Sequence, residues 1–194
     1  MKAVQFITTT LFSLSLVALS PAAHADDDGD PNPAGCGAGY DFDAEGTGSF
    51  VCGTTRIIQG TVGGSAYRTE FICNGAAGTI QDFSGDKEFY FDVGLNCFEF
   101  SNAGPNSYPT QISFDVRDQS GAGGPVPAVV HIYTLSSPFT PTQTFTVPTA
   151  RGVYTFVAGE YGSPADPITA ICLERPAGGD WSEATFDDIC VEKF

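Results

Sequence analysis

Hydrophobic and polar positions alternate along most of the chain after Tyr40, in short runs separated by Gly, Pro, Asn and Ser. The clearest run is TQISFDVRD, in which every second residue, Ile112, Phe114 and Val116, is apolar. A period of two places these side chains on one face of a strand and the polar residues on the other. Similar runs are KEFYFDV, PAVVHIYTL, TQTFTVP, GVYTFVAG and PITAICLE, and no stretch keeps helical spacing for long. About ten short strands bounded by turn residues predict an all-β sandwich or barrel.

The first residues follow a different pattern. Lys2 is followed by a short apolar run and by a small-x-small site that ends at Ala25. This arrangement is typical of a secretory signal peptide, here residues 1–25. Residues 26–39 are acidic and rich in Pro and Gly, so we interpret them as a disordered spacer. We expect residues 40–194 to form a single domain, secreted or periplasmic, with no transmembrane segment after the signal peptide.

The charge of the chain restricts its partners. There are 23 acidic residues against 8 basic ones, a formal net charge of −15. Nucleic acid and anionic membrane surfaces are bound through basic patches, so this balance argues against both. It is typical of a protein that stays soluble or that binds cations.

Six cysteines follow the signal peptide, and an even number in an exported chain predicts three disulfides. No CxxC motif occurs, which makes a zinc site improbable. Short loops favour sequential pairing, and in particular a bond between Cys172 and Cys190. The full set is Cys36, Cys52, Cys73, Cys97, Cys172 and Cys190.

The segments PITAICLER and TFDDICVEK can be aligned as an antiparallel hairpin with the last two cysteines face to face. This register places Arg175 opposite Asp187, an opposite-charge pair, and Glu174 opposite Asp188, a like-charge pair. A calcium ion would remove the second conflict, because it takes six to eight oxygen ligands. Two alternatives stay open: both carboxylates are solvated at an edge, or the two strands lie in different sheets of a Greek key.

Two short motifs lie near the ends of the predicted domain. The first is DFDAEGT at residues 41–47, and the second is DDICV at residues 187–191. Together with TQTFTVPTARGVYTF in the middle, they resemble the galactose-binding-like jelly rolls of many carbohydrate-binding modules, which often open with DFE-x-GT and close with DDI-x-V. MAM adhesion domains have similar ends and are a close competitor.

The resemblance implies a jelly-roll β-sandwich in which a structural calcium joins the first and last strands. Carried over to this sequence, it makes Asp43 and Asp188 the leading ligands, with Asp41, Glu45 and Asp187 as weaker candidates. The ion would fasten the ends of the domain and raise its melting temperature.

A lectin-like site needs an exposed aromatic ring beside polar groups. The sole tryptophan, Trp181, lies in the turn-rich stretch PAGGDWSEA between Asp180 and Glu183. These three residues form our predicted sugar platform. The alternative is a ring that packs over a loop.

Several catalytic arrangements are disfavoured. Adjacent strand residues point to opposite faces, so Asp187 and Asp188 should not act together as a glycosidase pair. His131 alternates with Val129 and Tyr133 and is best interpreted as a strand residue with a satisfied ring. The sequence therefore predicts a secreted, non-enzymatic binding protein for carbohydrate or a cell-surface ligand. The alternatives are an adhesion or surface-structural protein and a small secreted hydrolase.

Overall fold

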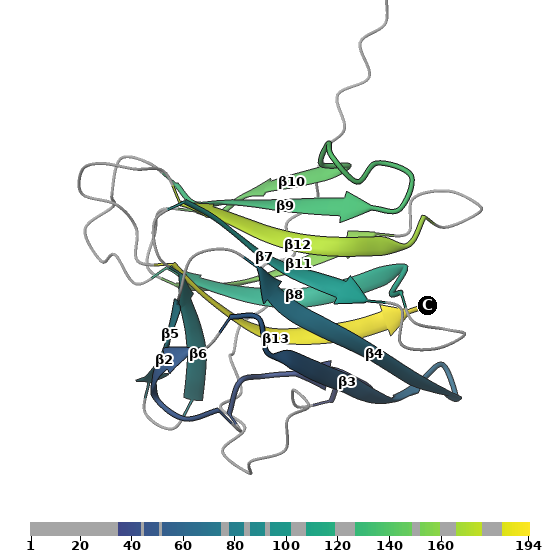
Figure 1. Ribbon diagram of the computed structural model, residues 1–194, viewed down its shortest axis with the longest axis horizontal. Helices are drawn as coiled ribbons and strands as arrows, with labels where there is room; N and C mark the ends of the chain where they lie inside the picture. The colour runs from purple at the N-terminus through teal and green to yellow at the C-terminus, as the bar shows by residue number, and fades with distance from the viewer. Residues whose placement is uncertain are drawn as a thin grey trace, which may run out of the picture.

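The computed structural model describes residues 35–43, 45–50, 52–74, 78–83, 86–91, 94–101, 108–118, 127–148, 152–159, 166–175 and 184–194. Within these ranges the chain forms strands and turns and has no helix (Figure 1). The strands are β1 (Gly39–Tyr40), β2 (Gly48–Phe50), β3 (Thr55–Val62), β4 (Ser65–Asn74), β5 (Gly78–Phe83), β6 (Asp86–Phe91), β7 (Gly94–Ser101), β8 (Gln111–Asp118), β9 (Val129–Thr134), β10 (Gln143–Thr146), β11 (Gly152–Gly159), β12 (Ile168–Arg175) and β13 (Ala184–Lys193).

The strands form two antiparallel sheets that pack face to face. Sheet A has the order β11-β8-β13-β6-β5-β2, with β1 pairing to β13, and sheet B has the order β10-β9-β12-β7-β4-β3. From β10 to β13 each successive strand changes sheet, so none of these four strands pairs with the next one in the sequence. The predicted all-β sandwich is confirmed. The described residues hold 13 strands where about ten were expected, partly because β1 and β2 are very short.

An aromatic core fills the space between the sheets. Phe98 of β7 lies at its centre, with ring centroids 5.2 Å from Phe89, 5.5 Å from Phe186 and 5.6 Å from Phe71. The three apolar residues predicted to share one face of β8 are all fully buried. Full burial of each such side chain stabilises the fold by about 1.5–3 kcal/mol. The polar residues of β8 therefore point to the outer face of sheet A.

The three disulfides differ from the sequential pairing. Cys172 of β12 is bonded to Cys97 of β7, and Cys190 of β13 is bonded to Cys36 in the N-terminal segment. The predicted bond between Cys172 and Cys190 is wrong because β12 belongs to sheet B and β13 to sheet A. The predicted hairpin and its facing charge pairs fail for the same reason. The third disulfide joins Cys52 to Cys73.

The two ends of the domain lie together. In β1 Gly39 pairs with Cys190 and Tyr40 with Ile189, so the opening segment lies along the last strand, β13. The predicted signal peptide and most of the predicted spacer lie outside the described residues, and the domain boundaries stay predictions. Among the residues that the structure describes, no helix is long and apolar enough to cross a membrane.

Candidate functional site

The sheet is irregular at the paired aspartates of β13. Asp187 pairs with Asp115 of β8 and the next pair joins Cys190 to Ser113, so β13 uses three residues where β8 uses two. This is a β-bulge, and at its centre Asp188 has a positive φ of 51°. The bulge breaks the alternation of faces, and both aspartates line the same small cavity. The interpretation that they point to opposite faces is wrong.

Five carboxylates gather on the outer face of sheet A around this bulge, and we call them the acidic centre. Oxygen atoms of Asp86, Glu88 and Asp187 all lie within 4.8 Å of one another, and Asp115 and Asp188 line the same cavity. Asp86 and Glu88 share a face of β6, since they are two residues apart. Glu88 is 1% exposed and Asp187 is 7% exposed. These three residues can hold a metal ion.

One basic side chain, Arg117, balances part of this charge. Its Nη2 donates to Asp86 Oδ2 over 2.7 Å, and its Nε donates to Glu88 Oε1. The hydroxyl of Thr185 donates to the other oxygen of Glu88. Oδ1 of Asp187 is buried and has no hydrogen-bond partner among the described residues. A buried carboxylate oxygen without a donor costs free energy, so this atom needs a proton or a cation.

Burial and crowding raise the pKa values of Glu88, Asp115, Asp187 and Asp188. Burial is the main cause for Glu88 and raises its pKa to about 7, with a further contribution from the nearby charge of Asp86. Burial also raises the pKa of Asp188 to about 7, assisted by Asp115 and Asp86. For Asp187, burial and then the charge of Asp188 raise the pKa well above its ordinary range. In the absence of a cation, burial and crowding therefore favour the protonated forms of these carboxyl groups.

The opening segment lies beside the acidic centre. Asp41 and Asp43 are both buried, and their charges also raise the pKa of Asp188. Oδ1 of Asp43 accepts the backbone N–H of Lys87 over 2.9 Å, and its carbonyl oxygen accepts from the Lys87 ammonium. Oδ1 of Asp41 accepts the N–H of Asp43 over 3.0 Å. Of the predicted calcium ligands, the structure thus brings Asp41, Asp43, Asp187 and Asp188 into one region.

Glu45, the remaining predicted ligand, contacts Arg56 and Tyr40 instead of the acidic centre. Its Oε1 forms an ion pair with Nε of Arg56 over 2.5 Å and also accepts the hydroxyl of Tyr40. The guanidinium of Arg56 in turn lies 3.8 Å from the ring centroid of Phe50. Glu45 therefore stabilises the turn before β2 and is not part of the acidic centre.

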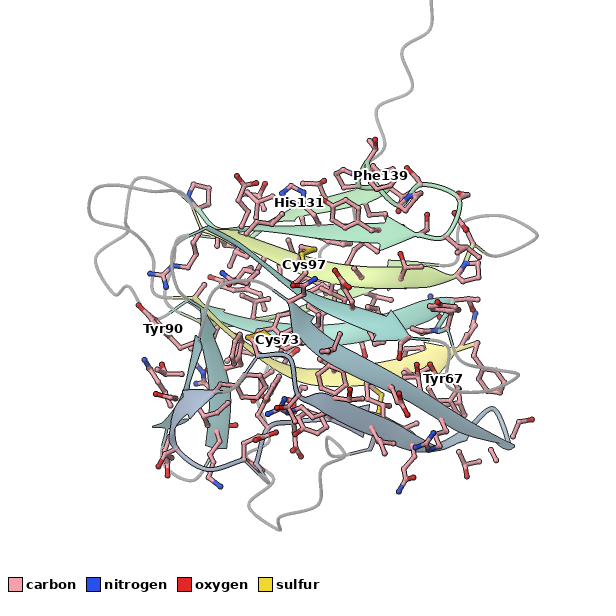
Figure 2. The ribbon with its side chains drawn as sticks, viewed as in Figure 1. Tyr67, Cys73, Tyr90, Cys97, His131 and Phe139 are labelled. Carbon is pink, nitrogen blue, oxygen red and sulfur yellow. A yellow bond between two sulfur atoms is a disulfide. The ribbon has the colours of Figure 1, made fainter. Side chains whose placement is uncertain are left out.

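A groove of about 470 Å³ crosses the outer face of sheet B. The disulfide between Cys97 and Cys172 lies among its lining residues, which come from β7, β9, β12 and the loop 135–142. The ring of Phe139 is 94% exposed at its rim (Figure 2). The other apolar lining residues include Leu95, Phe100, Tyr133 and Pro138, and the polar ones are Glu99 and Thr169.

His131 lies on the same outer face as the groove. Its Nε2 is 2.9 Å from Glu174 Oε2, and its Nδ1 is 3.2 Å from Thr144 Oγ1. Both ring nitrogens therefore have partners, as the interpretation of a satisfied strand histidine expected. Glu174 faces this imidazole and not Asp188, since the two carboxylates belong to different sheets.

The predicted sugar platform of Trp181, Asp180 and Glu183 lies outside the described residues. The exposed aromatic that the sequence reasoning missed is Phe139. It stands in SSPFTPT, between two prolines and outside any alternating run. A large apolar residue in a turn-rich loop has no strand face through which to be buried, and this pattern was the available signal.

Comparisons with known proteins give little for this chain. No family model matches it, and no curated protein matches it. One solved structure, described as "CBM4 structure and function", is similar with 15% sequence identity and a TM-score of 0.29. The likeness covers 87% of this chain and 92% of that one. It is too weak to carry an argument, so the fold assignment rests on the two sheets themselves.

Proposed function

We propose that this protein is an exported, non-enzymatic β-sandwich that binds carbohydrate in the groove on the outer face of sheet B. The observation that carries this proposal is the exposed ring of Phe139 beside polar groups. Exposed apolar patches on a folded protein commonly mark binding surfaces. Phe139 and the partly buried ring of Tyr133 line one groove with the carboxylate of Glu99 and the hydroxyl of Thr169.

The size and lining of the groove suit a sugar. Ligand sites typically enclose about 300–1,000 Å³, and the groove lies within that range. A pyranose ring has apolar C–H faces and a rim of hydroxyl groups. Its faces fit aromatic rings such as Phe139 and Tyr133, while its hydroxyl groups fit Glu99 and Thr169.

The groove supports binding better than hydrolysis. Glycoside hydrolysis usually needs two carboxylates that flank the scissile bond. The lining of the groove, within the described part of the chain, contains one carboxylate, that of Glu99. The imidazole of His131, on the same outer face, has partners at both ring nitrogens. This arrangement favours a binding protein.

A glycan array tests the proposal, followed by titration calorimetry with the best ligand. We expect Phe139→Ala to weaken binding at least tenfold, because truncation of an anchoring aromatic typically costs about 2 kcal/mol or more. Leu135→Ala is the matched control, since Leu135 is 57% exposed in the same loop but does not line the groove. If wild-type protein binds no glycan, or if both variants bind like wild type, the proposal is wrong.

The same surface could serve adhesion, and the Phe139→Ala variant separates the two functions. Self-association, or capture of a cell-surface protein, that depends on Phe139 would favour an adhesion protein if no glycan binds. The groove lining makes carbohydrate the better choice, because it places polar groups around the aromatic rings.

The proposal includes export. Disulfides persist in oxidising compartments, and the structure contains three of them. Together with the apolar N-terminal run, they support secretion or a periplasmic location. N-terminal sequencing of the protein produced with its leader should find a chain that begins at Asp26.

We also propose that the sandwich binds a structural calcium ion. Support comes from the net charge of −15 and from the carboxylates of the acidic centre. An ion that binds only the folded state stabilises it by mass action. The melting temperature should therefore be higher in millimolar calcium than in chelator, with the disulfides intact. Equal melting temperatures would count against calcium.

A further inference from the structure

We infer that the cation site is built across β6 and β13 on the outer face of sheet A, with Asp86, Glu88 and Asp187 as its side-chain ligands. This inference rests on the proposed calcium ion and specifies where it binds. It differs from the resemblance, which implies a site led by Asp43 and Asp188 between the first and last strands.

Three carboxylates from β6 and β13 converge on the outer face of sheet A. β6 pairs with β13 so that Phe89 faces Phe186, and the next residues along, Glu88 and Asp187, are therefore cross-strand neighbours. Asp86, two residues before Glu88, lies on the same face of β6. One carboxylate oxygen from each of the three residues lies within 4.8 Å of the other two. Such a separation lets one ion contact all three oxygens, because calcium–oxygen distances are about 2.3–2.6 Å.

One oxygen of Asp187 is buried without a hydrogen-bond donor among the described residues. This side chain is 7% exposed, and its Oδ1 has no hydrogen-bond partner in the described part of the chain. It lines a cavity of about 10 Å³ together with Asp86 and Glu88. That volume is about the space that one water or ion needs. A cation there would satisfy the oxygen that the protein leaves without a donor.

Two acidic residues of the opening segment, Asp43 and Glu45, interact with basic side chains outside the acidic centre. Asp43 Oδ1 already accepts the backbone N–H of Lys87, and its carbonyl accepts from the Lys87 ammonium. Glu45 is held by Arg56. Asp43 is thus held by Lys87 and Glu45 by Arg56, while the carboxylates of β6 and β13 converge on one cavity.

The chemical class of the ion follows from the donors. All three are carboxylate oxygens, which favour hard cations such as Ca²⁺ over zinc or copper. Asp115 and Asp188 lie at the same cavity and add negative charge. Arg117 pairs with Asp86 and Glu88, but each carboxylate oxygen has a second lone pair that can reach an ion. The acidic centre therefore fits one calcium ion with the remaining positions taken by backbone oxygens or water.

Calcium titration of the full chain, stripped with chelator, tests this inference. We expect one ion to bind wild type and Asp187→Asn to weaken binding at least tenfold. Asp86→Asn should do the same, and it provides a second variant at a more exposed position if Asp187→Asn does not fold. Asp43→Asn and the distant Glu99→Gln are the matched controls and should bind within about threefold of wild type.

The outcomes separate the two proposals. If wild-type protein binds no calcium, both the structural calcium and this site are wrong. If wild type binds calcium, Asp43→Asn loses it and Asp86→Asn retains it, the ion exists but this location is overturned. If Asp86→Asn or Asp187→Asn loses calcium binding while Asp43→Asn retains it, the result supports the site across β6 and β13.

Discussion

The outer faces of the two sheets both depart from the usual distribution of residues, in which charged side chains are exposed and large apolar ones are buried. On sheet A the carboxylates of Glu88 and Asp187 are buried, although acidic side chains are mostly exposed. On sheet B the ring of Phe139 and the side chain of Leu95 are exposed, although they are apolar. The two faces therefore present different chemistry: buried carboxylates on sheet A and exposed apolar side chains on sheet B. We propose a cation for the first and a sugar for the second.

Each outer face also has its own disulfide. The bond between Cys36 and Cys190 lines a pocket of about 190 Å³ that shares Asp115 and Asp188 with the acidic centre. The bond between Cys97 and Cys172 lies in the groove of sheet B. The two covalent links therefore provide a way to disturb either face separately.

The largest effects should follow removal of these disulfides. The sequence separations are 154 for Cys36–Cys190 and 75 for Cys97–Cys172. Without the bond, the unfolded chain gains conformational entropy. The free energy of unfolding of either double Cys→Ala variant should therefore fall by about 4–5 kcal/mol, and the two decreases should differ by less than about 1 kcal/mol. Denaturant unfolding measures both values.

Ligand affinity provides a second measurement on the same two variants. In folding conditions, the Cys36→Ala/Cys190→Ala variant should lose more calcium affinity, whereas the Cys97→Ala/Cys172→Ala variant should lose more glycan affinity. If both variants lose both ligands to the same degree, the two faces are not independent.

The next largest effect concerns Arg117, the internal counter-charge of the acidic centre. Arg117→Gln should cost about 3 kcal/mol in chelator, since it leaves the buried carboxylate of Glu88 without its ion pair. Calcium should reduce this cost, because the ion replaces part of the lost positive charge. Thermal unfolding in calcium and in chelator checks the difference, and a cost that calcium does not change would argue against an ion near Glu88.

A smaller effect is expected from pH in the absence of calcium. The pKa values of Glu88 and Asp188 are raised by burial to about 7, from an ordinary value of about 4 in the unfolded chain. Groups with a raised folded-state pKa contribute stability that is present below about pH 4 and is lost as pH rises through about 7.

The melting temperature in chelator should therefore fall by several degrees between about pH 5 and pH 8, since each kcal/mol corresponds to about 2–4 °C for a chain of this size. Glu88→Gln, which does not ionise, should flatten this slope. A melting temperature that rises across the same interval would contradict the account of the acidic centre.

The smallest effect should come from the rim of the groove. Leu95 is 48% exposed and lines the groove, so Leu95→Ala should weaken glycan binding by about two- to fivefold without a change in stability. Ile57→Ala is the control, because Ile57 is 42% exposed on β3, away from the groove. Equal affinities for both variants would restrict the ligand contacts to the loop around Phe139.

The sequence predicted the strands well because strand alternation is a local property. Ile112, Phe114 and Val116 are buried as their spacing required. Gly39 and Tyr40, directly before the DFDAEGT motif, pair with β13, so the first and last strands are neighbours as the resemblance implied. Disulfide pairing was wrong because it depends on which sheet each strand joins, and β12 and β13 join different ones.

The bulge explains the main failure at the site. A single inserted residue turns Asp188 toward the cavity of Asp187, and a rule of strict alternation does not foresee it. The contributions of Asp86 and Glu88 were also missed, because they lie about a hundred residues from β13 in the sequence and meet it only through sheet pairing. The available signal was the pair Asp86 and Glu88, which stand two residues apart at the start of the predicted strand KEFYFDV.

Hydrogen exchange of the full chain, measured with calcium alone and with glycan alone, tests the assignment of the two faces most directly. We predict that calcium protects β6 and the part of β13 around Asp187, and that glycan protects β7, β12 and the loop 135–142. The two footprints should not overlap. Glycan protection centred on β6 and β13, or one shared footprint for both ligands, would contradict the account.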